Sequence, residues 1–576
     1  MKQTEKTNPT TAVTLVGFGT PQEVQGSGDT WQIAHMANDS LFIMNNDGSG
    51  IEPRNTEPGA FTTKAHNHAV ISMLPPSFNP EFPHTVTDIT DGRRIIHPAS
   101  ETDFLQKHMR SVSILNEDTQ TMETFAHPYS TDIYEIDGVL YHIVIYSRQI
   151  PGNWGFVYSN LTRSLDMGRT WENFKGEIDT PTEPTWEDSF FPKGWGQVTF
   201  VKYGKGGAAP DVDRAQEFVY VLARVDERYR TDDTPAGYNM ARIRRSVLLE
   251  WNTAQGNTNV RNQWEFFSFG LVRTAEDAKM AEEDRFWVSD PTKAMPFFDE
   301  GWSTAIVYNE GLGRYFKTLF ISDAFQRPII ESTLSLHEAP HPWGPWVRIH
   351  EEHMQAKAND NLTWAYLFPK FISADGKKMW KSVTGALARN SHVFPRGHDG
   401  YTLQVMPVFL TTEPAHTIYV TDQEKTTHNG LEERTYNKHK DNCDTQITGL
   451  GGFEAGRYIS FKLNAPAAGE YIVNFRYRTT GITGAQDASD EAMELYRRQT
   501  FPSISLYLND VKRKQLPLGR TVQVYSEWSN MSLFLPLDAG ENVVTFRMHE
   551  DDNGSDVVIH SLTFAKYTGV MPLPLD

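Results

Sequence analysis

Two aspartates near the N-terminus have a spacing at which one β-hairpin would bring their carboxylates together. Asp29 opens the segment DTWQIAHMANDSLFIMNND, and Asp47 closes it. If the segment folds back on itself, the antiparallel return places both residues at the same end of the hairpin. Two carboxylates that face one cavity can act as proton donor and as base or nucleophile, the minimum equipment for cleaving a glycosidic bond. The adjoining Gly48-Ser49-Gly50 would let a substrate approach the backbone.

The same pattern also fits a structural role for Asp29 and Asp47. Aspartate is common at strand ends and turns because its side chain bonds local amides. A third acid is harder to place, and Asp226, which closes the predicted strand EFVYVLARVD, is the preferred candidate. Other acids near predicted strand ends are Asp188, Glu300 and Glu331. For any of these acids, a solvated or salt-bridged surface position is the plain alternative.

Candidate substrate ligands follow other predicted strands. Arg148 comes directly after a predicted strand, where its guanidinium could hold a sugar carboxylate, a sulfate or a catalytic aspartate. Trp31, Trp154 and Trp195 are candidate platforms for a sugar ring, with core packing as the alternative for each.

Histidines offer a rival chemistry. His66 and His68 lie two positions apart, which places both imidazoles on one face of a strand, and His142 lies in a later predicted strand. These residues would suit metal binding or the base of a polysaccharide lyase, with Arg148 neutralising a uronate; a hydrogen-bonded core or surface histidine is the commoner case. His68 is also a candidate substrate ligand.

The elements that must position these residues are short strands joined by turns. A strand rich in β-branched and aromatic residues meets an Asp or Gly turn and continues into a second strand in five segments: 29–47, 131–147, 197–226, 303–322 and 365–385. Repeated hairpins with irregular insertions predict a five-bladed β-propeller over residues 12–411, with a large β-sandwich as the alternative. Ser164–Trp171 (SLDMGRTW) resembles the Asp-box turn of sialidases and related propellers, whose role is structural, so Asp166 is not placed in the active site.

A polar, proline-containing joint, TTEPAH at 411–416, predicts a domain boundary. The strands beyond it predict a jelly-roll β-sandwich over residues 416–569. The runs GGFEAGRYISFKL, AGEYIVNFRYR, LYLND, LPLDAGENVVTF and IHSLTF resemble the galactose-binding-like carbohydrate-binding modules of polysaccharide-degrading enzymes. The resemblance implies sugar binding, through exposed aromatics such as Tyr525 or Trp528, and a module that can hold a structural Ca²⁺.

The N-terminal part carries a second resemblance. The runs DTWQIAHMANDSLFIMNNDGSG, DGVLYHIVIYSR, YNEGLGRYF, HEAPHPWGPW and FISADGKKMW resemble a group of five-bladed propellers formerly described only as a domain of unknown function, some of which act as endo-D-arabinanases. In that group a pair of aspartates at the two ends of the first hairpin is implicated in catalysis, and these match Asp29 and Asp47. The usual ADDG turn is here Ala37-Asn38-Asp39-Ser40, and long insertions at 78–110 and 231–288 depart further, so arabinan specificity is not carried over.

Composition restricts the partners. The chain has 576 residues, a net charge of −19 without a cationic stripe, and one cysteine, Cys443, so a nucleic-acid surface and an intrachain disulfide are not expected. No apolar run is long enough to span a membrane, and the first residues, MKQTEKTNPTTA, are polar. We therefore expect a cytoplasmic protein, or a secreted or periplasmic one whose signal peptide has been removed.

Together these features predict an all-β glycoside hydrolase that cleaves a complex polysaccharide without a catalytic cofactor. A propeller lyase with a His or Tyr base and a non-catalytic sugar-binding protein are the alternatives. The sugar, the linkage and the oligomeric state are left open.

Overall fold

The computed structural model describes most of both predicted regions. The described residues are 11–19, 22–51, 69–80, 94–95, 112–116, 121–125, 128–150, 153–168, 170–174, 189–192, 194–225, 237–251, 258–297, 302–303, 305–322, 329–357, 365–383, 402–437, 446–479, 502–518, 528–554 and 556–570. Within them β-strands predominate, and the α-helices are the short α2 (Arg245–Glu250) and α3 (Ala275–Ala281). The all-β prediction is confirmed.

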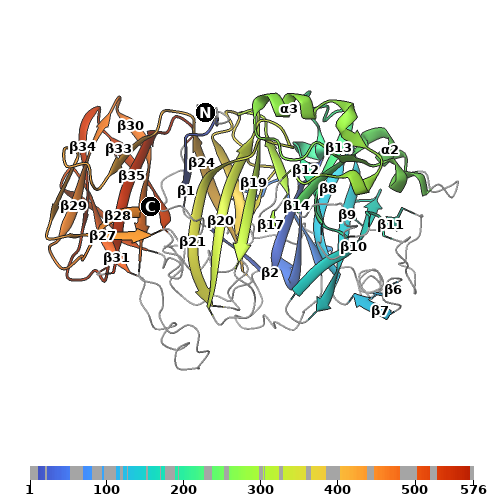
Figure 1. Ribbon diagram of the computed structural model, residues 1–576, viewed down its shortest axis with the longest axis horizontal. Helices are drawn as coiled ribbons and strands as arrows, with labels where there is room; N and C mark the ends of the chain where they lie inside the picture. The colour runs from blue at the N-terminus through green and yellow to red at the C-terminus, as the bar shows by residue number, and fades with distance from the viewer. Residues whose placement is uncertain are drawn as a thin grey trace, which may run out of the picture.

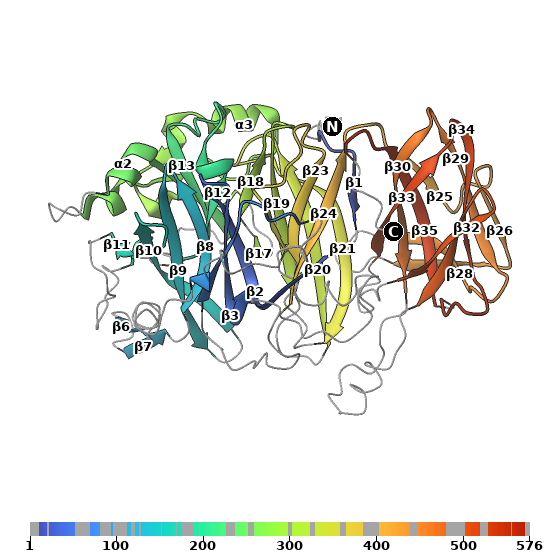
Figure 2. The ribbon, with the colours of Figure 1, turned by 180° about the vertical axis from the view of Figure 1, so that it is seen from behind.

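The described strands up to residue 411 form five blades of antiparallel strands, apart from β6 (Val112–Asn116) and β7 (Thr121–Phe125), which form a separate hairpin (Figures 1 and 2). A short parallel strand pairing links the third blade to the fourth. Each predicted hairpin supplies the first two strands of one blade. The first blade contains β2 (Gln22–His35), β3 (Leu41–Ile51), β4 (Ala69–Leu74) and β5 (Arg94–Ile95), and the second contains β8 (Pro128–Ile136), β9 (Val139–Ile150), β10 (Asn153–Ser164) and β11 (Glu172–Asn173). The third contains β12 (Trp195–Lys202), β13 (Phe218–Val225), β14 (Gly237–Arg244), β15 (Glu265–Phe267) and β16 (Trp287–Val288). The fourth contains β18 (Ile306–Asn309), β19 (Arg314–Ser322), β20 (Ile329–Ala339) and β21 (Val347–Lys357), with β17 (Trp302–Ser303) beside β19, and the fifth contains β22 (Ala365–Leu367), β23 (Lys378–Val383) and β24 (Thr402–Thr411).

An apolar cluster fills each of the five spaces between neighbouring blades, including the space between the last blade and the first. There Trp31 and Ile33 of the first blade pack with Phe368 and Trp380 of the fifth. The other four clusters join the remaining pairs of neighbours in turn. The blades therefore form a closed ring, as predicted for a five-bladed propeller.

The N-terminal strand completes the last blade. β1 (Leu15–Phe18) and the first residues of β2 pair successively with one edge of β24, with Leu15 opposite Thr411 and Val24 opposite Leu403. From Gly26 onward, β2 becomes the innermost strand of the first blade and pairs with β3. The two ends of the propeller chain thus share one sheet, which closes the ring.

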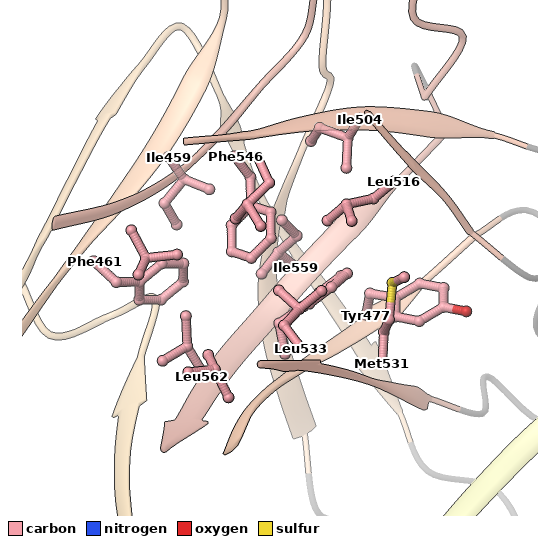
Figure 3. Packing of buried hydrophobic residues seen from close by; sticks show 14 of the residues in the cluster. Ile459, Phe461, Tyr477, Ile504, Leu516, Met531, Leu533, Phe546, Ile559 and Leu562 are labelled. Atoms are coloured by element: carbon pink, nitrogen blue, oxygen red, sulfur yellow. The ribbon is translucent and has the colours of Figure 1, made fainter. Parts of the chain in front are cut away.

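The described residues between 416 and 570 form two packed sheets. One contains β27 (Glu432–Asn437), β28 (Gln446–Gly451), β35 (Val558–Lys566), β30 (Gly469–Arg478) and β33 (Ser529–Leu537), with β25 (His416–Tyr419) beside β35; the other contains β26 (Thr426–Asn429), β29 (Tyr458–Ala465), β34 (Gly540–Arg547), β31 (Ser503–Leu508) and β32 (Val511–Pro517). Alternate residues point inward, so that Ile459, Phe461 and Phe546 of one sheet meet Leu533 and Leu562 of the other (Figure 3). The predicted β-sandwich is confirmed.

The sandwich packs against the fifth blade rather than hanging from a loose linker. Both overall views place it beside β1 and β24 (Figures 1 and 2). An apolar cluster joins Leu15 and Phe409 to Ile472, Ala565 and Tyr567. Polar bonds reinforce this contact: the Asn474 amide donates to the Val16 carbonyl at 2.8 Å, and the Thr411 hydroxyl donates to the Lys566 carbonyl at 2.6 Å.

Replacing Gly17 by leucine tests this interface. A Cβ at Gly17 would lie 2.9 Å from Phe534 Cζ and 3.1 Å from Ile472 Cγ2, closer than van der Waals contact permits. We expect Gly17→Leu to lower the free energy of unfolding by about 1–3 kcal/mol, the usual cost of overpacking. The matched control is Gly204→Leu, because a Cβ there meets nothing closer than 3.8 Å. Denaturant unfolding compares the two, and equal stability would contradict a tightly packed interface.

Candidate active site

The backbone brings Asp29 and Asp47 to the same end of the first blade. Asp29 pairs with Asn46, the residue before Asp47, and the register shifts on both sides of this pair. The tight turn that joins β2 to β3 lies at the opposite end of the hairpin. Both carboxylates lie outside the described side chains, so their convergence stays a prediction.

The connections between β3 and β4, β13 and β14, β19 and β20, and β23 and β24 also leave the blades at this end. They cover residues 52–68, 226–236, 323–328 and 384–401, all outside the described residues. At the other end, polar contacts link neighbouring blades. For example, Lys370 Nζ donates to the Asp39 carbonyl at 2.6 Å, which joins the fifth blade to the first.

Asn46 holds the backbone beside the two aspartates. Its amide nitrogen donates to Thr30 Oγ1 at 2.5 Å and to the Ser130 carbonyl at 2.8 Å, and its oxygen accepts from the Ser130 N–H at 3.0 Å. Thr30, the residue after Asp29, has φ = 48°, a conformation that costs a β-branched residue energy and persists only where its surroundings enforce it. Asn46 thus anchors the strained segment that contains Asp29. Its bonds to Ser130 tie this segment to β8, the innermost strand of the second blade.

His142 lies beneath the same strand. It is buried, its Nε2 is 2.7 Å from Ser130 Oγ, and its ring meets Trp171 edge-on at 5.5 Å. This is the structural role that the sequence left open for a histidine. His66 and His68 lie outside the described residues. Among the described residues, no group of three or more His, Cys, Asp and Glu side chains could hold a metal ion, and the structural Ca²⁺ stays a prediction.

A buried ion pair joins the innermost strands of three blades. Lys202 Nζ of β12 lies 2.5 Å from Asp132 Oδ1 of β8 and donates to the carbonyls of Ile33 at 2.7 Å and Ile133 at 3.1 Å. Asp132 Oδ2 accepts from the Phe200 N–H at 2.7 Å. Burial raises the pKa of the Asp132 carboxyl and lowers the pKa of the Lys202 amine, and their mutual attraction opposes both shifts. The pair therefore links the innermost strands of the first, second and third blades to one another.

Sequence reasoning did not identify Asp132 or Lys202. The available signal was a charged residue inside an otherwise apolar strand, in TDIYEI and in VTFVK. Such a residue must be paired when it is buried, because an isolated charge is too costly to remove from water.

The tryptophan predictions need correction. Trp31 has no exposed surface and packs between the first and fifth blades, so the prediction that it forms a sugar platform is wrong. Trp195 is likewise a core residue, packed edge-on against Phe266 at 5.0 Å. An indole packs between blades as well as it stacks on a sugar ring. Here the indoles of both Trp31 and Trp195 pack between blades.

The remaining predicted site residues cannot be placed by their side chains. Arg148 pairs with Gly155 and Trp154 with Gln149 through the backbone of β9 and β10, at the end of this blade away from the β8–β9 turn. Their side chains, and all of Asp226 and His68, lie outside the described residues, as do the side chains or whole residues of the other third-acid candidates: Asp188, Glu300 and Glu331.

Asp166 has the turn-forming role predicted for it. Its Oδ1 accepts from the Thr170 N–H at 2.8 Å and its Oδ2 from the Thr170 hydroxyl at 2.8 Å. Trp171 is buried below the turn and donates to the Gly168 carbonyl at 3.1 Å. The motif therefore stabilises the β10–β11 connection.

Removing the Asn46 amide should destabilise the ring. Asn46→Ala leaves the buried Ser130 N–H and carbonyl without these partners and releases Thr30, so we expect the free energy of unfolding to fall by about 2–4 kcal/mol. Asn262→Ala is the control, because Asn262 is exposed on a short 3₁₀ segment, Thr258–Gln263. Denaturant titration measures both. An Asn46→Ala variant as stable as the control would show that these three bonds do not hold the segment.

No protein-family model and no curated protein matches the chain. Among solved structures, an exo-β-1,3-galactanase from Phanerochaete chrysosporium with β-1,3-galactotriose is 10% identical over 96% of this chain and 99% of that chain, at a TM-score of 0.33. A family 35 carbohydrate-binding module from Clostridium thermocellum is 16% identical over 26% of this chain and 98% of that chain, at a TM-score of 0.20. At these TM-scores the likeness carries no argument about activity, and the architecture rests on the strand pairing. No helix in the described part of the chain is long and apolar enough to cross a membrane.

Proposed function

We propose that this protein is a glycoside hydrolase that cleaves a complex polysaccharide, with Asp29 and Asp47 as its catalytic carboxylates. The observation that carries the proposal is the β2–β3 register, because Asp29 faces the neighbour of Asp47 at the start of an innermost propeller strand. Innermost strands surround the propeller axis, so their ends line the space in which a substrate can be enclosed. Asp226 is the proposed third acid, and the sandwich is proposed to bind the polymer.

The surroundings suit acid–base chemistry. Asn46, Ser130 and His142 form a hydrogen-bonded support beneath this end of the hairpin, and catalytic groups need such support to hold their geometry. The local strain at Thr30 also fits a functional position, since strained backbone concentrates at such sites. No step in the proposed reaction needs a cofactor.

Product analysis tests the reaction class. The purified protein would be incubated with a panel of algal, plant and mycobacterial polysaccharides, and reducing ends and ultraviolet absorbance would be followed together. Hydrolysis raises reducing ends without creating a double bond, whereas a lyase leaves an unsaturated sugar that absorbs. Absorbance from a new double bond would overturn the proposal and move attention to His66, His68 and Arg148.

A further inference from the structure

The outward face of the second sandwich sheet carries a line of aromatic and cationic side chains. Ile459 and Phe461 of β29 and Phe546 of β34 point into the core (Figure 3). Because side chains alternate along a strand, Tyr458 and Arg547 lie on the opposite face. The β29–β34 side of the sandwich lies away from the propeller in both overall views (Figures 1 and 2).

These residues lie on one face of four adjacent strands. Arg547 is directly opposite Ser505 of β31, and Tyr507, which is buried with its ring stacked on His549, lies two positions further along β31. Tyr458 of β29 is directly opposite Arg547 of β34, and Tyr507 of β31 is directly opposite Lys512 of β32. The Arg547 guanidinium carbon lies 5.3 Å from the centre of the Tyr458 ring and 5.0 Å from that of Tyr507. We call Tyr458, Arg547, Tyr507 and Lys512 the sheet-face stripe.

Unlike several arginines of the molecule, Arg547 has no acidic partner among the described residues. Arg163, Arg242 and Arg457 are each paired with a glutamate, at 2.6, 2.7 and 2.5 Å. Among the described residues, no carboxylate lies within salt-bridge distance of Arg547, and its Nε is buried without a hydrogen-bond acceptor. Its guanidinium is therefore held in place by two rings while its capacity to bind an anion is unused.

The neighbouring strand adds positive charge. Residues 511–515 of β32, VKRKQ, are all exposed and include Lys512, Arg513 and Lys514. This local cationic strip belongs to a chain whose net charge is −19. Lys512 is opposite Tyr507, and β31 separates it from Arg547. Its positive charge favours an anionic ligand on this face.

We propose that the sheet-face stripe binds an acidic polysaccharide, with Arg547 holding a carboxylate or sulfate, the half-buried Tyr458 ring stacking on a sugar face, and Lys512 meeting a second acidic group. Guanidinium groups bind both oxyanions through two parallel N–H bonds, and an aromatic ring packs well against the apolar face of a sugar. Taking the ligand as a polysaccharide rests on the proposed function. Trp528, predicted to be an exposed sugar contact, is buried beside His560, so that prediction is wrong; Tyr525 lies outside the described residues.

Binding of defined polymers to the full-length chain tests the stripe. The Asp29→Asn chain would be used to prevent turnover, with three probes in affinity electrophoresis and calorimetry: polygalacturonate for carboxylates, carrageenan for sulfates, and amylose as a neutral polymer. We expect retention by at least one acidic polymer and none by amylose; the acidic polymer that is retained identifies the anion. Arg547→Met should weaken that binding about tenfold or more, since it removes a charge-assisted pair.

Three further variants separate binding from packing. Tyr458→Phe keeps the ring and should bind normally, whereas Tyr458→Ala should bind several-fold more weakly. Lys512→Met changes an exposed residue that the fold does not need, so it keeps the test valid if Arg547→Met fails to fold. Arg285→Met is the matched control: Arg285 also lies over an aromatic ring, Phe286, at 4.7 Å, but on the propeller.

Equal binding by Arg547→Met and Arg285→Met would overturn the inference, as would equal retention by amylose. If Arg547→Met and Arg285→Met bind equally, the cations of β32 would instead serve to protect this edge strand from pairing with strands of other chains. These binding measurements need no catalysis. A failure of the stripe to bind acidic polymers is therefore separate from a failure of the wild-type chain to cleave polysaccharide. Only the second result counts against the hydrolase proposal.

Discussion

Replacement of Asp29 or Asp47 by asparagine is expected to lower polysaccharide cleavage by about 10²–10⁴-fold while preserving the fold. Asparagine has nearly the same shape as aspartate but can neither give up nor accept a proton at neutral pH. The strand register that pairs Asp29 with Asn46 should survive, because it depends on backbone bonds. The measurement is the initial rate of reducing-end release at saturating polymer, so that a loss of kcat is distinguished from a change in KM.

Asp39 provides the control for this experiment. It lies in the same hairpin but at the tight-turn end, where a hydrogen bond from His35 holds the pKa of the Asp39 carboxyl down to about 2. Its φ of 71° suits asparagine as well as aspartate, so Asp39→Asn should fold and retain its cleavage rate. If Asp29→Asn cleaves as fast as Asp39→Asn, Asp29 is not the catalytic acid or base.

Replacement of Lys202 by methionine is expected to cost about 3–5 kcal/mol of folding free energy, the usual effect of breaking a buried ion pair from one side. The Asp132 carboxylate would remain buried without its cation, and the carbonyls of Ile33 and Ile133 would lose their donor. For a domain of this size the midpoint of thermal unfolding should fall by roughly 4–6 °C. Scanning calorimetry measures the shift.

Two further variants serve as controls for the Lys202→Met measurement. Lys205→Met removes an exposed lysine whose Nζ is 3.7 Å from Asp39, and it should change stability little because exposed pairs contribute little. The double variant Lys202→Met with Asp132→Leu should recover part of the lost stability, since an apolar pair leaves no buried charge. A Lys202→Met chain as stable as Lys205→Met would show that the buried pair does not hold the three blades together.

The five hairpins could be predicted because their information is local. In segments such as 131–147, apolar residues alternate around an Asp-Gly turn, and this pattern specifies two strands and their register without knowledge of the remaining chain. Five such units then restrict the fold to few architectures. The same argument gave the sandwich, where strand β33 alternates between buried and less buried residues.

The site was harder to predict because its determinants are not local. Trp31 and Trp528 are buried by strands distant in sequence, and the residue type alone does not distinguish a core indole from an exposed one. The Asp132–Lys202 pair depends on how two blades meet. The bulges around Asp29 shift the register in a way that alternation does not encode, so the sequence indicated the end of the hairpin but not the direction of each side chain.

The pairing of β1 with β24 has a consequence for synthesis on the ribosome. Thr14 bonds to Thr411, 397 positions later, so the first strand of the propeller to be translated has no partner until nearly the whole ring has been made. Translation at about 5–20 residues per second leaves this apolar segment exposed for tens of seconds. A nascent chain with β1 free is therefore the species most open to chaperone capture or to pairing with another copy, and ring closure is the step at which that exposure ends.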